Sequence, residues 1–164
     1  MLEKSNTSKK IFSTNKAWRI FINGGEDELD SKTFVAKLQD IANNYKTVYM
    51  WGTFGAPVTE SLIAQKAKQY PSWYTASRQA HFLSLIGKGY FAFDCVNLIK
   101  AVLWGWCGDA SKTYGGAVYA SNGVPDIDAD TMIQRCKDVS TNFTNIIPGE
   151  AVWCPGHIGV YIGD

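Results

Sequence analysis

The sequence predicts an α+β protein, with N-terminal helices packed on a C-terminal antiparallel sheet. Two patterns support this fold class. Apolar residues recur at helical spacing in several segments between residues 31 and 139, and short alternating segments bounded by Pro-Gly turns occupy residues 150–162. The 164 residues are 46% hydrophobic, which suits one globular domain with a core of its own.

Residues 1–30 are expected to form an N-terminal tail or extension. The segment is rich in polar residues and has one apolar patch, residues 18–22, so we expect a tail with one short strand or turn. Its basic start precedes no apolar run of signal-peptide length, and no signal peptide is expected. The predicted domain therefore covers residues 31–164.

The first helix is expected from residue 31 to about residue 45. Its apolar residues fall on one face at 3.6-residue spacing, and Asp30 or Ser31 can cap its start. Residues 47–51 are β-branched and aromatic and lead into a glycine- and proline-containing loop, residues 52–57.

Three further helices are expected between residues 59 and 106. Thr59 can cap a helix that reaches about residue 69, and a third helical pattern covers about residues 74–86. Asp94 can cap a helix over residues 95–106 that is apolar nearly all round, which predicts a central position in the fold.

The last third of the chain changes character. Loops are expected over residues 108–122, and a helix capped by Asp126 or Asp128 over about residues 128–139. The alternating carboxylates at 126, 128 and 130 lack the Gly and closing Glu of an EF-hand, so they indicate a helix start rather than a calcium loop. Two antiparallel strands then follow, at 150–154 and 157–162.

Charge and hydropathy exclude two classes of partner. Sixteen Lys and Arg against fifteen Asp and Glu give a formal charge of +1, with no basic stripe, so we expect no nucleic-acid binding. The longest aliphatic and aromatic stretch, residues 101–107, contains Gly105 and is far shorter than a membrane span, so no membrane partner is expected.

The cysteine spacing indicates reduced thiols rather than a disulfide framework. Cys95, Cys107, Cys136 and Cys154 are irregularly spaced and form no CxxC pair. Cys154 and His157 have the spacing of half a zinc site, but no second ligand pair accompanies them. We therefore predict neither a metal nor a cofactor.

Two residues have the positions that thiol chemistry needs. A thiolate is stabilised at a helix N-terminus by unpaired amides and the helix dipole, and Cys95 opens the most apolar helix. A neutral imidazole can take the thiol proton and return it to a leaving amine, a task open to His157 at the start of the last strand. Taken singly, each residue is more simply a buried cysteine or a turn histidine.

Three segments in order resemble the NlpC/P60 family of cysteine peptidases. Residues 93–99, with sequence FDCVNLI, are similar to its nucleophile motif. The segments 148–153 and 156–164 resemble its strand pair with the catalytic histidine, and residues 49–52 resemble its upstream tyrosine segment. The resemblance covers about residues 31–164 and is stronger in combination than in any single motif.

The resemblance implies a papain-like fold and hydrolysis of amide bonds in the peptide part of bacterial peptidoglycan through a thioester acyl-enzyme. Cys95 would be the nucleophile and His157 its base. Tyr49 would line the site and help to hold the oxyanion, and Asp94 would fix the loop and cap the helix. The chain would then be a cell-wall hydrolase of the phage-lysin type, cytoplasmic until it is released to the cell wall, with peptidoglycan stem peptides as its partners.

The chain departs from the family pattern at three places. Val96 and Asn97 stand where the family usually has Ser and Gly, and residues 53–90 form an insertion of about forty residues. The polar residue that orients the histidine in the family lies on a strand after the histidine strand, which this sequence does not include.

Two alternatives follow from these departures. The first alternative to a hydrolase is a catalytically incomplete module that binds wall peptide or a protein partner. The second is a thiol acyltransferase on the same scaffold. Thiol reactivity separates the first from a hydrolase, because an activated Cys95 is alkylated at lower pH than an ordinary thiol. Transfer products identify the second. Oligomeric state is not predicted by any of these patterns.

Overall fold

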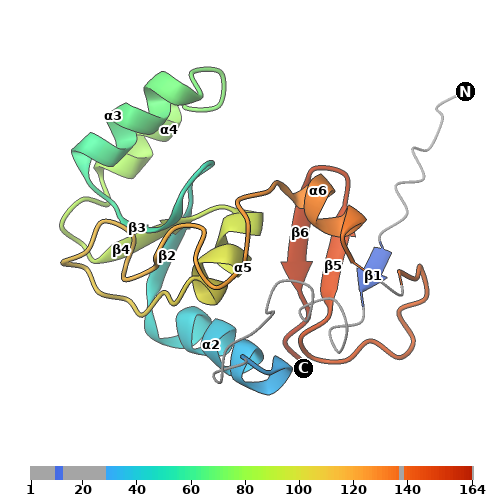
Figure 1. Ribbon diagram of the computed structural model, residues 1–164. Helices are drawn as coiled ribbons and strands as arrows, with labels where there is room; N and C mark the ends of the chain where they lie inside the picture. The colour runs from blue at the N-terminus through green and yellow to red at the C-terminus, as the bar shows by residue number, and fades with distance from the viewer. Residues whose placement is uncertain (1–9, 13–28, 137–138, 164) are drawn as a thin grey trace, which may run out of the picture.

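The computed structural model describes residues 10–12, 29–136 and 139–163. It has the helices α2 (Ser31–Asn44), α3 (Glu60–Gln69), α4 (Ala76–Leu83), α5 (Cys95–Leu103) and α6 (Ala129–Gln134). Its strands are β1 (Lys10–Phe12), β2 (Lys46–Tyr49), β3 (Phe54–Pro57), β4 (Tyr90–Phe93), β5 (Ala151–Cys154) and β6 (His157–Val160). The predicted α+β class is confirmed (Figure 1).

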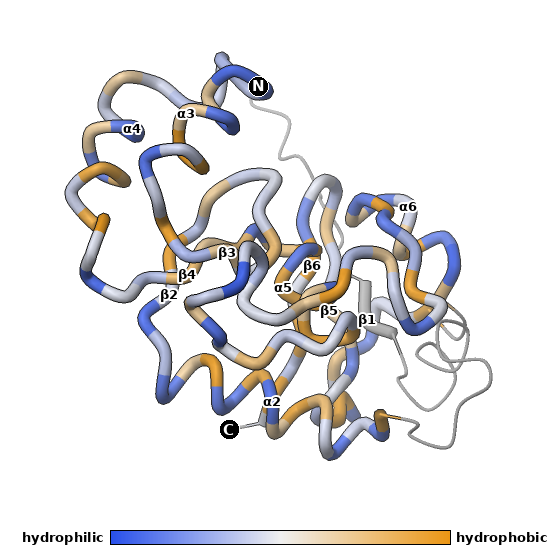
Figure 2. The backbone as a smooth tube through the Cα atoms, turned by 60° about the vertical axis from the view of Figure 1, so that its left-hand side comes forward, coloured by the Kyte–Doolittle hydropathy of each residue, from blue (hydrophilic) through white to orange (hydrophobic). Residues whose placement is uncertain are grey.

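The strands form two small sheets with α5 between them. One sheet is antiparallel, in the order β1-β5-β6, and the other has the order β2-β4-β3, with β2 parallel to β4. Helix α5 packs against β6 on one side and β3 on the other (Figure 1). The tube is orange along much of α5, as expected for an apolar helix (Figure 2). This confirms the central position predicted for that helix.

The predicted layout of helices first and strands last is wrong in the first half of the chain. Residues 54–57, predicted as a loop, form β3, and the apolar run 90–93 forms the middle strand of the second sheet. Gly55 and Pro57 marked a loop because both weaken strands, but an edge strand with a register shift tolerates them. Pairing with β4 is a tertiary contact that local sequence does not show.

The N-terminal segment also contributes more than a tail. Lys10 to Phe12 pair with Trp153 to Ala151 and give the histidine-bearing hairpin a third strand. The apolar patch at 18–22 lies outside the described residues. The boundary predicted at residue 31 therefore separates one strand from its own sheet.

Most predicted helix starts are confirmed by their capping bonds. Thr33 N donates to the Asp30 carboxylate at 2.6 Å, and the side chains of Thr59, Asp94 and Asp128 accept in the same way at α3, α5 and α6. Three helices are shorter than predicted, ending at residues 83, 103 and 134 instead of 86, 106 and 139. Side-chain caps fix the start of a helix locally, whereas its end depends on packing.

Two hydrophobic clusters build the interior. The larger surrounds α5 and includes side chains from α2, α6 and the β5–β6 hairpin. The smaller lies beneath α3 and α4 and includes Met50, Ile63, Tyr74 and Phe82. Among the described residues, no helix is long and apolar enough to cross a membrane.

Candidate functional site

Cys95 is the first residue of α5 and is partly buried. Two backbone hydrogen bonds tie the end of β4, the strand before Cys95, to the loop after β2. Met50 N donates to Phe93 O at 2.9 Å, and Asp94 N donates to Thr53 O at 3.0 Å. The thiol therefore stands at the N-terminus of a buried helix.

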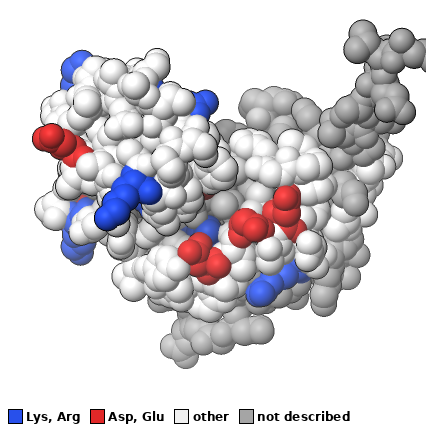
Figure 3. Space-filling model, turned by 90° about the horizontal axis from the view of Figure 1, so that it is seen from above, with Lys and Arg blue, Asp and Glu red and all other residues white. Residues whose placement is uncertain are grey.

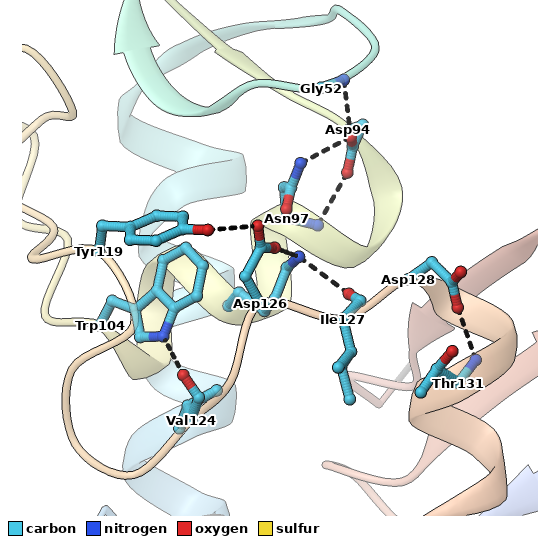
Figure 4. A network of polar contacts seen from close by, with 11 residues as sticks. Gly52, Asp94, Asn97, Trp104, Tyr119, Val124, Asp126, Ile127, Asp128 and Thr131 are labelled. Carbon is cyan, nitrogen blue, oxygen red and sulfur yellow. Dashed lines mark hydrogen bonds and ion pairs between the residues drawn. The ribbon is translucent and has the colours of Figure 1, made fainter.

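Asp94 ties this helix start to the loop that follows β2 (Figure 4). One carboxylate oxygen accepts from Asn97 N at 2.8 Å, and the other accepts from Gly52 N at 2.8 Å and from Asn97 Nδ2 at 2.7 Å. Burial raises the pKa of this carboxyl, and the bonds from Asn97 and Gly52 and the charge of Lys100 act against that rise. The predicted capping role is confirmed, and Asn97 proves to be a partner of Asp94.

Gly52 is required at its position for two reasons. Its φ of 79° lies in the region that side chains rarely adopt. A Cβ atom there would stand 2.5 Å from Cε2 of Tyr70. The loop beside Cys95 is therefore built around a glycine whose amide is directed at Asp94.

His157 is the first residue of β6 and is exposed. The preceding turn is bound by Asp130 of α6, whose Oδ1 accepts from Gly156 N at 2.8 Å and from Trp153 Nε1 at 2.9 Å. Asp130 therefore fixes the backbone one residue before the histidine. Within the described part of the chain, no hydrogen bond reaches the His157 imidazole.

Cys95 and His157 line the same groove, of about 400 Å³. Its lining is largely apolar and comes from α2, β2, β4, α5 and β6, including Leu38, Phe93 and Ile158. The structure thus brings the predicted nucleophile and base to one cleft, although they are 62 positions apart in the sequence (157 − 95).

Tyr49 lines this groove from the end of β2 and is 49% exposed. Partial burial, then the charges and hydrogen bond of Cys95 and the charge of Asp94, raise the pKa of its phenol to about 12. The hydroxyl is therefore protonated at neutral pH and remains a hydrogen-bond donor beside the thiol. Lining of the site is seen, whereas a part in oxyanion binding stays a prediction.

A second cavity, of about 330 Å³, adjoins Cys95 on another side. Three aromatic residues, Tyr49, Trp51 and Trp73, line it together with Asp128 and Asp130. When the molecule is seen from above, acidic side chains gather near the middle of the visible face, and most basic ones lie over the lobe at its left (Figure 3). Access to Cys95 is thus framed by rings and carboxylates.

A buried lysine joins α5 to the segment at residues 126–127. Lys100 is 2% exposed and forms an ion pair with Asp126, and its Nζ also donates to Ile127 O at 2.9 Å. Asp126 also accepts from the Tyr119 hydroxyl at 2.7 Å. Although burial raises the pKa of the Asp126 carboxyl, the bonds from Lys100 and Tyr119 bring it below its ordinary value.

The other three cysteines line neither cavity at Cys95. All four cysteines are unpaired. Burial raises the pKa of Cys136 to about 11, and its Sγ contacts Met132 O at 3.3 Å. Cys154 and His157 are facing partners in the β5–β6 register, and the described residues contain no group of three or more potential metal ligands.

The sequence names Cys95 and His157 as candidates for the reaction but does not reveal the residues that hold them. Asn97 stands out only as a departure from the family motif, Asp126 as a possible cap and Asp130 as part of a helix start, and Lys100 does not stand out. A lysine directly after the motif at residues 93–99, inside a largely apolar helix, is a signal that indicates a required counter-ion. Its partner, 26 positions away, is not readable from the sequence.

Comparison with protein-family models, with curated proteins and with solved structures gives no match to this chain.

Proposed function

We propose that the chain is a papain-like cysteine peptidase or amidase of the NlpC/P60 type that hydrolyses amide bonds in the peptide part of bacterial peptidoglycan. One observation above all supports the proposal: Cys95, at the N-terminus of a buried helix, lines one groove with His157 and Tyr49. The second support is the order of the three motifs in the sequence.

The proposed reaction uses one imidazole for four proton transfers, two in each half of the reaction. His157 takes the proton of the Cys95 thiol, and the sulfur attacks the carbonyl carbon of the scissile amide. The oxyanion accepts hydrogen bonds from the Cys95 backbone amide and the Tyr49 hydroxyl. The imidazolium then gives its proton to the leaving amine as the C–N bond breaks. Water attacks the thioester and gives a proton to His157, and the imidazolium passes that proton to the Cys95 thiolate as the C–S bond breaks and the carboxylic acid is released.

An incomplete, binding-only domain is the alternative that a specific observation favours. The imidazole of the exposed His157 accepts and donates no hydrogen bond among the described residues, and an imidazole without an orienting partner is a weaker base in a less defined position. A thiol acyltransferase remains the other reading of the same groove.

The test is digestion of purified peptidoglycan in H₂¹⁸O by the full chain and by Cys95→Ala, with products identified by mass spectrometry. We expect new termini from the wild type alone, each new carboxyl carrying one ¹⁸O, and loss of at least about a thousandfold in rate for Cys95→Ala. Cys107→Ala is the matched control, because Cys107 is an exposed thiol that lines neither cavity at Cys95.

Three outcomes separate the alternatives. Products without ¹⁸O, joined to an added amine, would identify a transferase. Unchanged peptidoglycan that retains the protein would identify a binding domain. Cleavage that persists in Cys95→Ala would refute the proposed nucleophile.

A further inference from the structure

A third cavity lies next to the two that adjoin Cys95. It has a volume of about 460 Å³ and shares Trp51, Asp94, Val96 and Asp128 with the second cavity. Because those four residues line both spaces, the two cavities are neighbours, one reaching Cys95 and the other reaching α3. A substrate held at Cys95 can therefore extend into the third cavity.

Aromatic rings form one part of its lining. Trp51 and Tyr119 are 47% and 53% exposed, a large exposure for side chains of this size. Trp51 stacks on Tyr70 with ring centroids 5.6 Å apart and an angle of 2° between the rings. The Tyr119 ring is fixed by its bond to Asp126. Exposed, rigid rings present flat apolar surfaces to the C–H face of a ligand ring.

Hydrogen-bonding groups of both kinds form the remainder. Gln65 and Gln69 are exposed, and they lie four positions apart on α3, on one face of that helix. Their amides donate and accept, and the nearby carboxylates of Asp126 and Asp128 accept. Lys66 donates to Gln69 Oε1 at 3.1 Å and so orients that amide. Such a set matches hydroxyl groups, which are donors and acceptors at once.

The charge of the lining selects among ring-shaped ligands. Hydrogen bonds hold the pKa of both Asp126 and Asp128 below the ordinary value, so both are carboxylates at neutral pH. The lining has three acidic residues, Asp94, Asp126 and Asp128, and two lysines, Lys66 and Lys100, of which Lys100 is paired with Asp126, so it offers no excess of positive charge to a phosphate-bearing polymer or an anionic glycan. A neutral sugar ring with several hydroxyls satisfies the rings, the amides and the carboxylates together.

We infer that this cavity is a saccharide subsite, which binds a pyranose unit of the glycan strand while the attached peptide lies at Cys95. The inference rests on the proposed function for the identity of the sugar. Its lining comes from Trp51, from α3 and from the loop at residues 119–128. Because α3 lies within the predicted insertion at residues 53–90, the inference gives that insertion a role in substrate binding. In this reading the insertion makes the enzyme recognise peptide that is still joined to glycan.

The experiment uses the full chain with Cys95→Ala, so that binding is read without turnover, and the trisaccharide of β-1,4-linked N-acetylglucosamine as the probe. Indole N–H signals are followed by NMR, with the Trp51 signal assigned through Trp51→Phe. We expect saturable shifts of that signal with a Kd of about 1 mM. The double variant Gln65→Ala, Gln69→Ala should weaken binding by at least about tenfold, equivalent to about 1.4 kcal/mol.

Lys68→Ala is the matched control, because Lys68 is an exposed residue of α3 that does not line the cavity. Its affinity should equal that of the parent. The inference is overturned if the Trp51 signal does not move, or if the double variant binds as tightly as the control. Failure of the proposed function is read separately, as the absence of peptide cleavage by the wild type.

Discussion

The two sides of the groove at Cys95 are held in different ways. On the cysteine side, Asp94 caps α5 and accepts three hydrogen bonds. The ion pair between Lys100 of the same helix and Asp126 holds α5 further along. The histidine side is a short hairpin whose turn is bound by one carboxylate oxygen of Asp130, and His157 itself is exposed.

The difference shows where a reaction at this site is most easily lost. Buried networks give a side chain one position because an unsatisfied group in the interior costs free energy. An exposed residue at the end of an edge strand has no such constraint. Cys95 is therefore positioned by the interior of the protein, whereas the position of His157 depends on a few surface contacts.

The largest effect is expected on the cysteine side, from Asp126→Asn. The change removes the counter-charge of the buried Lys100 ammonium, and we expect the free energy of unfolding to fall by about 3 kcal/mol. The measurement is denaturant unfolding at pH 7. The double variant Lys100→Met, Asp126→Asn should be more stable than Asp126→Asn alone. Equal stability of the two would show that the ion pair does not hold α5.

A second large effect is expected on the histidine side, from Asp130→Ala. Loss of the bonds to Gly156 and Trp153 frees the turn before His157, and we expect kcat to fall by roughly a hundredfold while the fold is kept. Asp130→Asn should restore most of the rate, because its amide oxygen still accepts both bonds. A rate that is the same in Asp130→Ala and the wild type would break the comparison between the two sides.

A smaller effect is expected from Tyr49→Phe, which keeps the ring and removes the donor. We expect kcat to fall by about tenfold with little change in KM, since an oxyanion donor acts mainly in the transition state. Because the pKa of Tyr49 is about 12, this donor stays protonated, so the difference between variant and wild type should not vary between pH 6 and about pH 9. A change in KM alone would reassign Tyr49 to substrate contact.

The smallest effect is a pH dependence of stability. The folded-state pKa of Asp126 lies below its ordinary value of 3.8, so its ionised form stabilises the fold above pH 3.8, and this contribution is lost as the pH falls through the folded pKa. The stability difference between Asp126→Asn and the wild type should therefore shrink below pH 3.8.

Burial raises the pKa of Asp94 in the folded state, so Asp94→Asn should gain stability relative to the wild type as the pH rises through the raised pKa.

Much of the candidate site is written in local sequence. The caps at Asp30, Thr59, Asp94 and Asp128 and the final hairpin are confirmed, because a capping side chain and a turn act on residues within three or four positions. The same locality explains the misses at β3 and β4. Their residues become strands only by pairing across a turn and two helices.

What the sequence by itself determined is the fold class, the start of each capped helix and the residue types suited to thiol chemistry, because these depend on neighbours along the chain. Only the tertiary structure decided that Cys95 and His157 line one groove, that Lys100 meets Asp126, and that Asp130 holds the histidine turn. Those contacts join residues 23 or more positions apart, and no local pattern encodes them. They form because the packing of α5 between two sheets brings the segments together, and because the buried Lys100 ammonium requires a partner.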